Sequence, residues 1–180
     1  MNATEIRAAC ALAAIYILRM LGLFMVMPVL AILAMDYQGY TPWLVGLAIG
    51  GYGLTQALLQ IPMGMLSDRI GRKPVIVAGL VCFAIGSVVA GMADSMTWLI
   101  IGRIMQGAGA IAGAVMALAA DVTRESQRTK VMAIIGVSIG FSFYLALLLG
   151  PVLSSSYGLS GIFYITALLS VAGIALVLFI

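Results

Sequence analysis

Charge is scarce in this sequence. Only 8% of its 180 residues are Asp, Glu, Lys or Arg, against about a quarter in an average soluble domain. Histidine is absent, and the two cysteines, Cys10 and Cys82, stand alone inside apolar runs. These absences argue against a metal centre or a redox site. Because no nucleophile–base pair or nucleotide-binding loop occurs either, we expect no enzyme and no cofactor.

What is abundant is apolar sequence: 64% of residues are hydrophobic and the mean hydropathy is +1.21. A helix needs about 20 apolar residues to cross a bilayer. We therefore expect an all-α integral membrane protein with six spans. They are predicted at Ala8–Ala34, Trp43–Leu66, Pro74–Met92, Thr97–Ala120, Val131–Ser154 and Leu159–Ile180. The net charge of +3 lies mostly in short connections and indicates no nucleic-acid partner.

The basic residues predict the orientation of these spans. One set of connections, with the N-terminal segment, holds Arg7, Arg69, Arg72, Lys73, Arg124, Arg128 and Lys130. The opposite connections hold Asp36 and Asp94 and no Lys or Arg. The positive-inside rule then places both termini in the cytoplasm.

Two arginines lie inside the predicted spans. Arg19 is about 16 Å along the first span, and Arg103 about 9 Å into the fourth. An arginine at such depth costs at least about 2.5 kcal/mol. No Asp or Glu occurs within any predicted span. The partner is therefore backbone, water, a missing part of the protein or an anionic substrate, although Arg103 alone is near enough to the outer surface to snorkel.

Glutamines accompany these arginines. Gln56 and Gln60 share one face of the second span, and Gln106 shares a face with Arg103. A weaker stripe, Ser138 and Ser142, follows the fifth span, whereas the third and sixth are almost wholly apolar. This division predicts a central aqueous pathway. The glycine pairs Gly46/Gly50, Gly109/Gly113 and Gly136/Gly140 indicate close helix packing.

The two halves of this six-span unit are weakly alike. Arg19 with Gly22 in the first span corresponds to Arg103 with Gly107 in the fourth. Three spans repeated with opposite topology are typical of transporters. Chance similarity between glycine-rich apolar helices is the alternative.

The stretch Gly64–Lys73, GMLSDRIGRK, resembles the major facilitator superfamily signature G-x-x-x-D-R-x-G-R-K at every fixed position. It also falls between the second and third spans, where that family has it. Arg103–Ala110, RIMQGAGA, is similar to the family's span-four motif R-x-x-Q-G-x-G-A, and Gly22 with Pro28-Val29-Leu30 to its span-one motif. The whole chain most resembles the family's proton-linked efflux transporters.

That resemblance implies a multi-pass protein of the bacterial inner membrane with twelve spans in two halves. Residues 1–180 would be the N-terminal six-helix half, and the missing C-terminal half would be its partner. Since Ile180 lies within an apolar run, we expect a fragment of a longer transporter. Gly150 and Pro151 fit the span-five antiporter motif G-x-x-x-G-P-x-x-G-G. Ala146, Ser154 and Ser155 replace the other glycines of that motif. The direction of transport is therefore left open between efflux and uptake.

The resemblance also implies residue roles in alternating access. The conformational latch would comprise Gly64, Asp68, Arg69, Gly71, Arg72, Lys73 and Asp121, with Asp68 capping a helix of the other half and Arg72 paired to Asp121. Proton coupling would involve Arg103, Gln106 and Gly107. The proton carrier would be Asp68, Asp121 or a residue of the missing half. The alternative for the Gly64–Lys73 stretch is that its charges only set topology.

For substrate contact the sequence favours Arg19, Phe24, Tyr52, Gln56, Gln106 and Tyr144, with helix packing as the alternative for each. The partners expected are a small-molecule substrate, protons and the lipid bilayer. A transporter is the first hypothesis and a membrane scaffold or receptor on the same fold the second. A scaffold needs neither a gating motif nor an arginine at mid-bilayer, so Arg19 and the Gly64–Lys73 stretch favour transport.

Overall fold

The computed structural model describes residues 2–179, which are almost entirely helical. Its helices are α1 (Ala3–Leu33), α2 (Pro42–Ile70), α3 (Arg72–Gly91), α4 (Met96–Ala108), α5 (Ala112–Asp121) and α6 (Arg128–Phe179), with short 3₁₀ turns η1 (Ala34–Asp36) and η2 (Glu125–Gln127). Within the described residues, five helical segments are long and apolar enough to cross a membrane, with α4 and α5 counted together. The predicted all-α membrane class is confirmed at this level.

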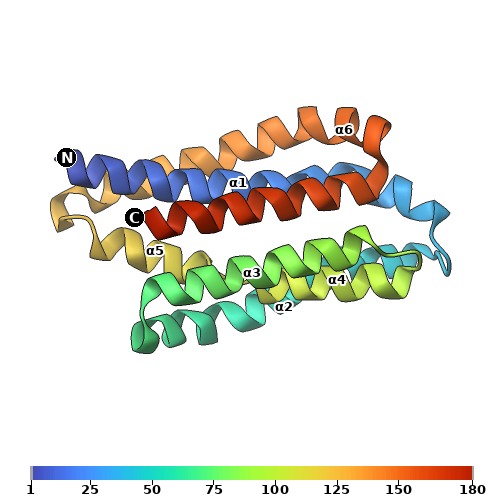
Figure 1. Ribbon diagram of the computed structural model, residues 1–180, viewed down its shortest axis with the longest axis horizontal. Coiled ribbons are helices and arrows are strands. Elements are labelled where there is room, and N and C mark those ends of the chain that lie inside the picture. The colour runs from blue at the N-terminus through green and yellow to red at the C-terminus, as the bar shows by residue number, and fades with distance from the viewer. Residues whose placement is uncertain (1, 180) are drawn as a thin grey trace.

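The long element α6 folds back on itself. Gly158 has a φ of 65°, a left-handed value that interrupts the helix. The limbs before and after it run antiparallel (Figure 1). The spans predicted at 131–154 and 159–180 fall on these two limbs, although the last residue, Ile180, lies outside the described residues.

The helices form two layers (Figure 1). One contains α1 between the two limbs of α6, and the other contains α2, α3 and α4. Side-chain hydroxyls join α1 to both limbs: Ser142 Oγ donates to the Ile17 carbonyl at 3.4 Å, and Thr166 Oγ1 to the Gly22 carbonyl at 3.1 Å. Both ends of the described chain lie at one end of the bundle, together with the α2–α3 and α5–α6 connections (Figure 1). We call this the charged end, because it carries Asp68, Arg72, Asp121 and Arg124.

The second span continues further than predicted. We expected it to stop at Leu66 and a loop to follow, but α2 runs to Ile70 and only Gly71 separates it from α3. Gly71 has a φ of 101°, which an L side chain adopts only with strain. Pro74 falls in the first turn of α3, where its missing N–H costs no hydrogen bond. The motif residues Asp68 and Arg72 therefore lie on helices, at the end of α2 and the start of α3.

The fourth span is broken where a continuous helix over Thr97–Ala120 was predicted. Helix α4 ends at Ala108 and α5 begins at Ala112. Gly109 lies against the Gly79 carbonyl and the Phe83 backbone of α3, so a side chain would not fit there. Two side chains of α1 donate hydrogen bonds to backbone carbonyls beside the break. Arg19 Nη2 donates to the Gly109 carbonyl at 3.1 Å, and Tyr16 Oη donates to the Ala112 carbonyl at 3.2 Å.

Only one of the predicted glycine pairs packs against another helix. Gly109 and Gly113 both approach backbone of neighbouring helices. A methyl group added at Gly46, Gly50, Gly136 or Gly140 would meet nothing within 4 Å. For those two pairs the packing prediction is wrong within the described chain, because they lie on faces of α2 and α6 that no other helix of this chain covers.

Candidate functional site

A cluster at the charged end centres on Arg72. Its Nε donates to Asp121 Oδ2 at 3.0 Å, its Nη1 donates to Ser67 Oγ at 2.7 Å, and it also forms an ion pair with Asp68. The Arg72–Asp121 pair suggested by the sequence is thus present. Ser67 was missed, although it is buried and lies three residues before Ile70 at the end of α2. One guanidinium therefore connects the end of α2, the start of α3 and the end of α5.

The rest of the predicted latch surrounds this cluster. Asp68 keeps 61% of its side chain exposed although it is paired. An added methyl at Gly64 would meet no atom within 4 Å, so the surface one turn before Asp68 is open. Arg69 and Lys73 are exposed and make no ion pair among the described residues.

A second ion pair at the charged end was not anticipated. Arg124 Nε lies 2.8 Å from Glu5 Oε1, and its Nη2 lies 3.0 Å from Glu5 Oε2. Glu5 also closes a capping box with Asn2 at the start of α1. Hydrogen bonds to this carboxylate raise the pKa of the Arg124 guanidinium. The sequence signal was Asn2 three residues before Glu5, which predicts the cap but not the arginine.

Inside the bundle, Arg103 heads a hydrogen-bonded network. Its Nη1 donates to Gln106 Oε1 at 2.7 Å, Gln106 Nε2 donates to Ser87 Oγ at 2.7 Å, and Ser87 Oγ donates to the Phe83 carbonyl at 2.7 Å. Arg103 Nε donates to the Ala48 carbonyl at 3.3 Å. Arg103, Gln106 and Ser87 are all fully buried. Ser87 was expected on an apolar outer helix, and the structure instead makes it the acceptor that orients Gln106.

Glycines let α4 approach its neighbours closely enough to build this network. A methyl group added at Gly86 would lie 2.6 Å from the backbone nitrogen of Gln106, and one added at Gly107 would collide with the Tyr52 carbonyl oxygen. The Tyr52 ring then faces Arg103, whose Cζ is 4.7 Å from the ring centroid. The predicted trio Arg103, Gln106 and Gly107 therefore forms one packed unit with α2 and α3.

Arg19 is buried elsewhere. Its guanidinium lies 5.4 Å from the Phe83 ring centroid and donates to Gly109 at the α4–α5 break. Its Nε and Nη1 have no partner among the described residues. Of the partners left open by the sequence, backbone is the one observed.

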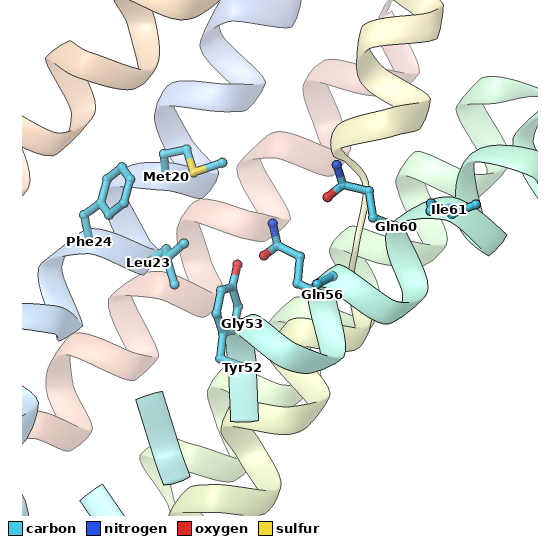
Figure 2. Close-up of a pocket in the computed structure, with 9 residues that line it drawn as sticks. Met20, Leu23, Phe24, Tyr52, Gly53, Gln56, Gln60 and Ile61 are labelled. Carbon is cyan, nitrogen blue, oxygen red and sulfur yellow. The ribbon is translucent and has the colours of Figure 1, made fainter. Parts of the chain in front are cut away.

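An open pocket of about 600 Å³ lies between α1 and α2. Its lining residues are Met20, Leu23, Phe24, Tyr52, Gly53, Gln56, Ala57, Gln60 and Ile61. Figure 2 shows the Tyr52 hydroxyl and the Gln56 and Gln60 amides projecting from α2 on the side facing α1. Of the residues predicted to contact substrate, Phe24, Tyr52 and Gln56 come together here.

The other residues predicted to contact substrate lie apart from the pocket lining. Arg19 and Gln106 are buried and do not line it, and Tyr144 is exposed on α6. Tyr144 follows Phe143, whose ring packs edge-on against Phe24 at 5.2 Å. Gly150 packs against α1, where an added methyl would lie 2.8 Å from the Met25 carbonyl, and Pro151 is exposed within α6.

Five helical segments of membrane-spanning length, among the described residues, define the chain as a multi-pass membrane protein, with an open pocket between α1 and α2 and an ion-pair cluster at one end. The family model described as Major Facilitator Superfamily matches residues 12–180, so the chain belongs to that family. It is a transporter family, and its members are not enzymes.

Named relatives agree with this assignment. The chain is 54% identical to the inner membrane transport protein YajR of Escherichia coli K12, over all 180 residues and 40% of YajR. It is 30% identical to the class B tetracycline resistance protein of Escherichia coli, over 92% of the chain and 42% of that protein. The crystal structure of the human organic anion transporter MFSD10 superposes with a TM-score of 0.84 at 20% identity, covering 98% of this chain and 47% of that one. The chain thus spans less than half the length of these proteins.

Proposed function

We propose that this chain is the N-terminal half of a secondary active transporter that moves small molecules across the bacterial inner membrane by alternating access. The observation that carries the proposal is the Arg72 cluster, in which Asp68 remains 61% exposed beside open space at Gly64. Charges that only set topology do not require a paired yet exposed carboxylate next to a glycine. A scaffold would not require it either.

The proposed architecture has six spans arranged as a 3+3 inverted repeat, with both termini cytoplasmic. It counts the two limbs of α6 as separate spans and α4 with α5 as one span. The break at Gly158 and the gathering of chain ends and basic residues at the charged end support it. The second half would dock on the uncovered faces of α2 and α6, where Gly46, Gly50, Gly136 and Gly140 lie.

In this mechanism Asp68 would cap the N-terminus of a helix in the other half. The helix dipole stabilises a carboxylate at that position by about 0.3–1 kcal/mol, and more where it is partly buried. The basic residues Arg69, Arg72 and Lys73 would surround Asp68 with positive charge. The ion pair with Asp121 would keep the Arg72 guanidinium in position. Closing this contact favours the outward-facing state, and protonating Asp68 releases it.

Proton-coupled efflux is the direction we favour. The similarity to a tetracycline resistance protein supports efflux, and the buried Arg103–Gln106 unit provides a charged group for coupling. Every Asp and Glu of the described residues lies at a helix end or in a connection. The proton carrier would therefore be Asp68, Asp121 or a residue of the other half. Uptake is the second candidate, because Ala146, Ser154 and Ser155 depart from the antiporter motif.

The test is transport by the complete protein in proteoliposomes, with and without an imposed proton gradient. A panel of labelled amphipathic compounds serves as candidate substrates. We expect gradient-driven movement of at least one compound against its concentration gradient. Movement in the direction of the protons would establish uptake, and equilibration alone, unaffected by the gradient, would remove proton coupling from the proposal.

A further inference from the structure

The pocket between α1 and α2 contains polar groups that the protein leaves unpaired. Tyr52 is only 4% exposed, yet its hydroxyl has no hydrogen-bond partner among the described residues, and neither has Gln56 Oε1. A buried polar atom without a partner costs about 1–3 kcal/mol. Both residues line the pocket, where the Tyr52 hydroxyl can donate a hydrogen bond to a bound molecule and Gln56 Oε1 can accept one.

A positive charge without a counter-ion among the described residues lies against the Tyr52 wall of this pocket. The Arg103 guanidinium lies behind the Tyr52 ring, 4.7 Å from its centroid. The groups that accept its hydrogen bonds, the Ala48 carbonyl and the Gln106 amide, are neutral, and its Nη2 has no partner among the described residues. No Asp or Glu lines the pocket. A charge in a low-dielectric interior is weakly screened, so the pocket has a positive potential.

The opposite wall of the pocket is apolar. Met20, Leu23 and Phe24 of α1 form it, and Phe24 is held by its edge-on contact with the Phe143 ring. A molecule with one acidic group and an apolar body would match both walls. A lipophilic cation would meet the repulsion of Arg103 without any carboxylate to bind it.

We propose that this pocket binds anionic amphipathic molecules, with a carboxylate or similar acidic oxygen accepting a hydrogen bond from the Tyr52 hydroxyl, next to the positive charge of Arg103. The apolar body then packs on Met20, Leu23 and Phe24. The proposal rests on the transporter function only for the statement that such a molecule is transported. The binding preference stands on the pocket itself.

The test measures equilibrium binding to the complete protein in nanodiscs without any gradient. The probes are 11-(dansylamino)undecanoate, its uncharged primary amide and the matching 11-(dansylamino)undecyl ammonium, with empty nanodiscs subtracted. We expect the carboxylate to bind about tenfold more tightly than the amide, since hydrogen bonds to a charged group are worth about 1.5–3 kcal/mol. The ammonium probe should bind more weakly than either.

Two variants separate the pocket from general partitioning into lipid. Tyr52→Phe keeps the ring on Arg103 and removes only the hydroxyl, so the preference for the carboxylate should fall several-fold, whereas Tyr157→Phe at an exposed α6 position should preserve it. Gln56→Glu should reverse the preference toward the ammonium probe. Equal or tighter binding of the ammonium probe by the unmodified protein, or an unchanged preference in Tyr52→Phe, would overturn the proposal.

Failure of this inference is distinguishable from failure of the transporter proposal. A protein that transports with a proton gradient but shows no preference for the carboxylate overturns the pocket assignment alone. A protein that binds the carboxylate through Tyr52 but moves no compound overturns transport alone.

Discussion

Buried arginine is the feature that most constrains single residues in this protein. Arg19 and Arg103 are both at most 1% exposed, and neither forms an ion pair with a carboxylate between residues 2 and 179. Each instead uses backbone carbonyls, an aromatic ring and, for Arg103, the Gln106 amide. Because these partners are neutral, each site keeps its full positive charge. The hydrogen bonds of Arg103 can therefore be tested with its charge kept, by one variant of its partner Gln106 and one of Arg103 itself.

Replacing Gln106 with Leu should destabilise the protein by about 2 kcal/mol. The change removes the acceptor of Arg103 Nη1 and the donor to Ser87 Oγ, and it leaves a buried cation with fewer partners. Gln106→Glu should lose less stability, because a carboxylate still accepts from Arg103. Thermal unfolding of the two variants in the same detergent checks this order, and equal unfolding temperatures for Gln106→Leu and the unmodified protein would contradict it.

Arg103→Lys should fold but lose most gradient-driven transport. An ammonium keeps the charge, but it cannot reach the Ala48 carbonyl and Gln106 together while lying on the Tyr52 ring as the planar guanidinium does. The measurement is initial transport rate in proteoliposomes, with protein insertion checked by reconstituted yield. A rate equal to that of the unmodified protein would separate Arg103 from coupling.

At the scale of helices, close packing depends on a few glycines. Gly86 of α3 and Gly102 of α4 bring these helices into contact, since a methyl at Gly86 would lie 2.8 Å from the Gly102 carbonyl. The close approach of α3 and α4 lets Ser87 Oγ accept a hydrogen bond from Gln106 Nε2. The position of the whole Arg103 network is thus set by backbone approach.

Gly86→Ala should therefore destabilise the protein by about 1–3 kcal/mol through overpacking. Gly113→Ala is the matched control, because its added methyl would make only ordinary contacts of 3.5–3.7 Å with α2. Thermal unfolding of both variants is the measurement. A Gly86→Ala protein as stable as Gly113→Ala would show that α3 and α4 separate without cost.

The sequence predicted most of these elements because apolar run length marks membrane helices directly. What it could not predict depends on contacts between distant segments. The break at 109–111 arises where Gly109 packs on α3 and Arg19 takes its carbonyl, and no local pattern encodes either contact. The pairing of Glu5 with Arg124 likewise joins residues far apart in the chain. Gln56 stood out in the sequence because an amide within an apolar helix is unusual, and the structure places it with Phe24 and Tyr52 in one pocket lining.

At the scale of the whole molecule, charge is concentrated at one end of the bundle. Arg72 with its two carboxylates and the Glu5–Arg124 pair both lie there, and the Asp94 connection lies at the other end. This asymmetry is the basis for placing the charged end in the cytoplasm.

Cysteine labelling tests that orientation. After Cys10 and Cys82 are replaced by Ala, single cysteines are introduced in the complete protein as Asp94→Cys and Ser126→Cys. In intact cells a membrane-impermeant maleimide should label position 94 and not position 126. The reverse pattern would mean that the charged end faces outward.

The latch is the central claim, and Asp68→Asn tests it most directly. The variant keeps the size of the side chain and removes the charge that would cap a helix of the other half. Transport by the complete protein in proteoliposomes is compared with Glu125→Gln, which neutralises an exposed acid at the same end of the bundle. We predict that Asp68→Asn inserts normally and transports about tenfold more slowly, consistent with up to about 2 kcal/mol for a partly buried cap, while Glu125→Gln is unchanged. Transport by Asp68→Asn at the unmodified rate would contradict the latch and leave topology as the role of these charges.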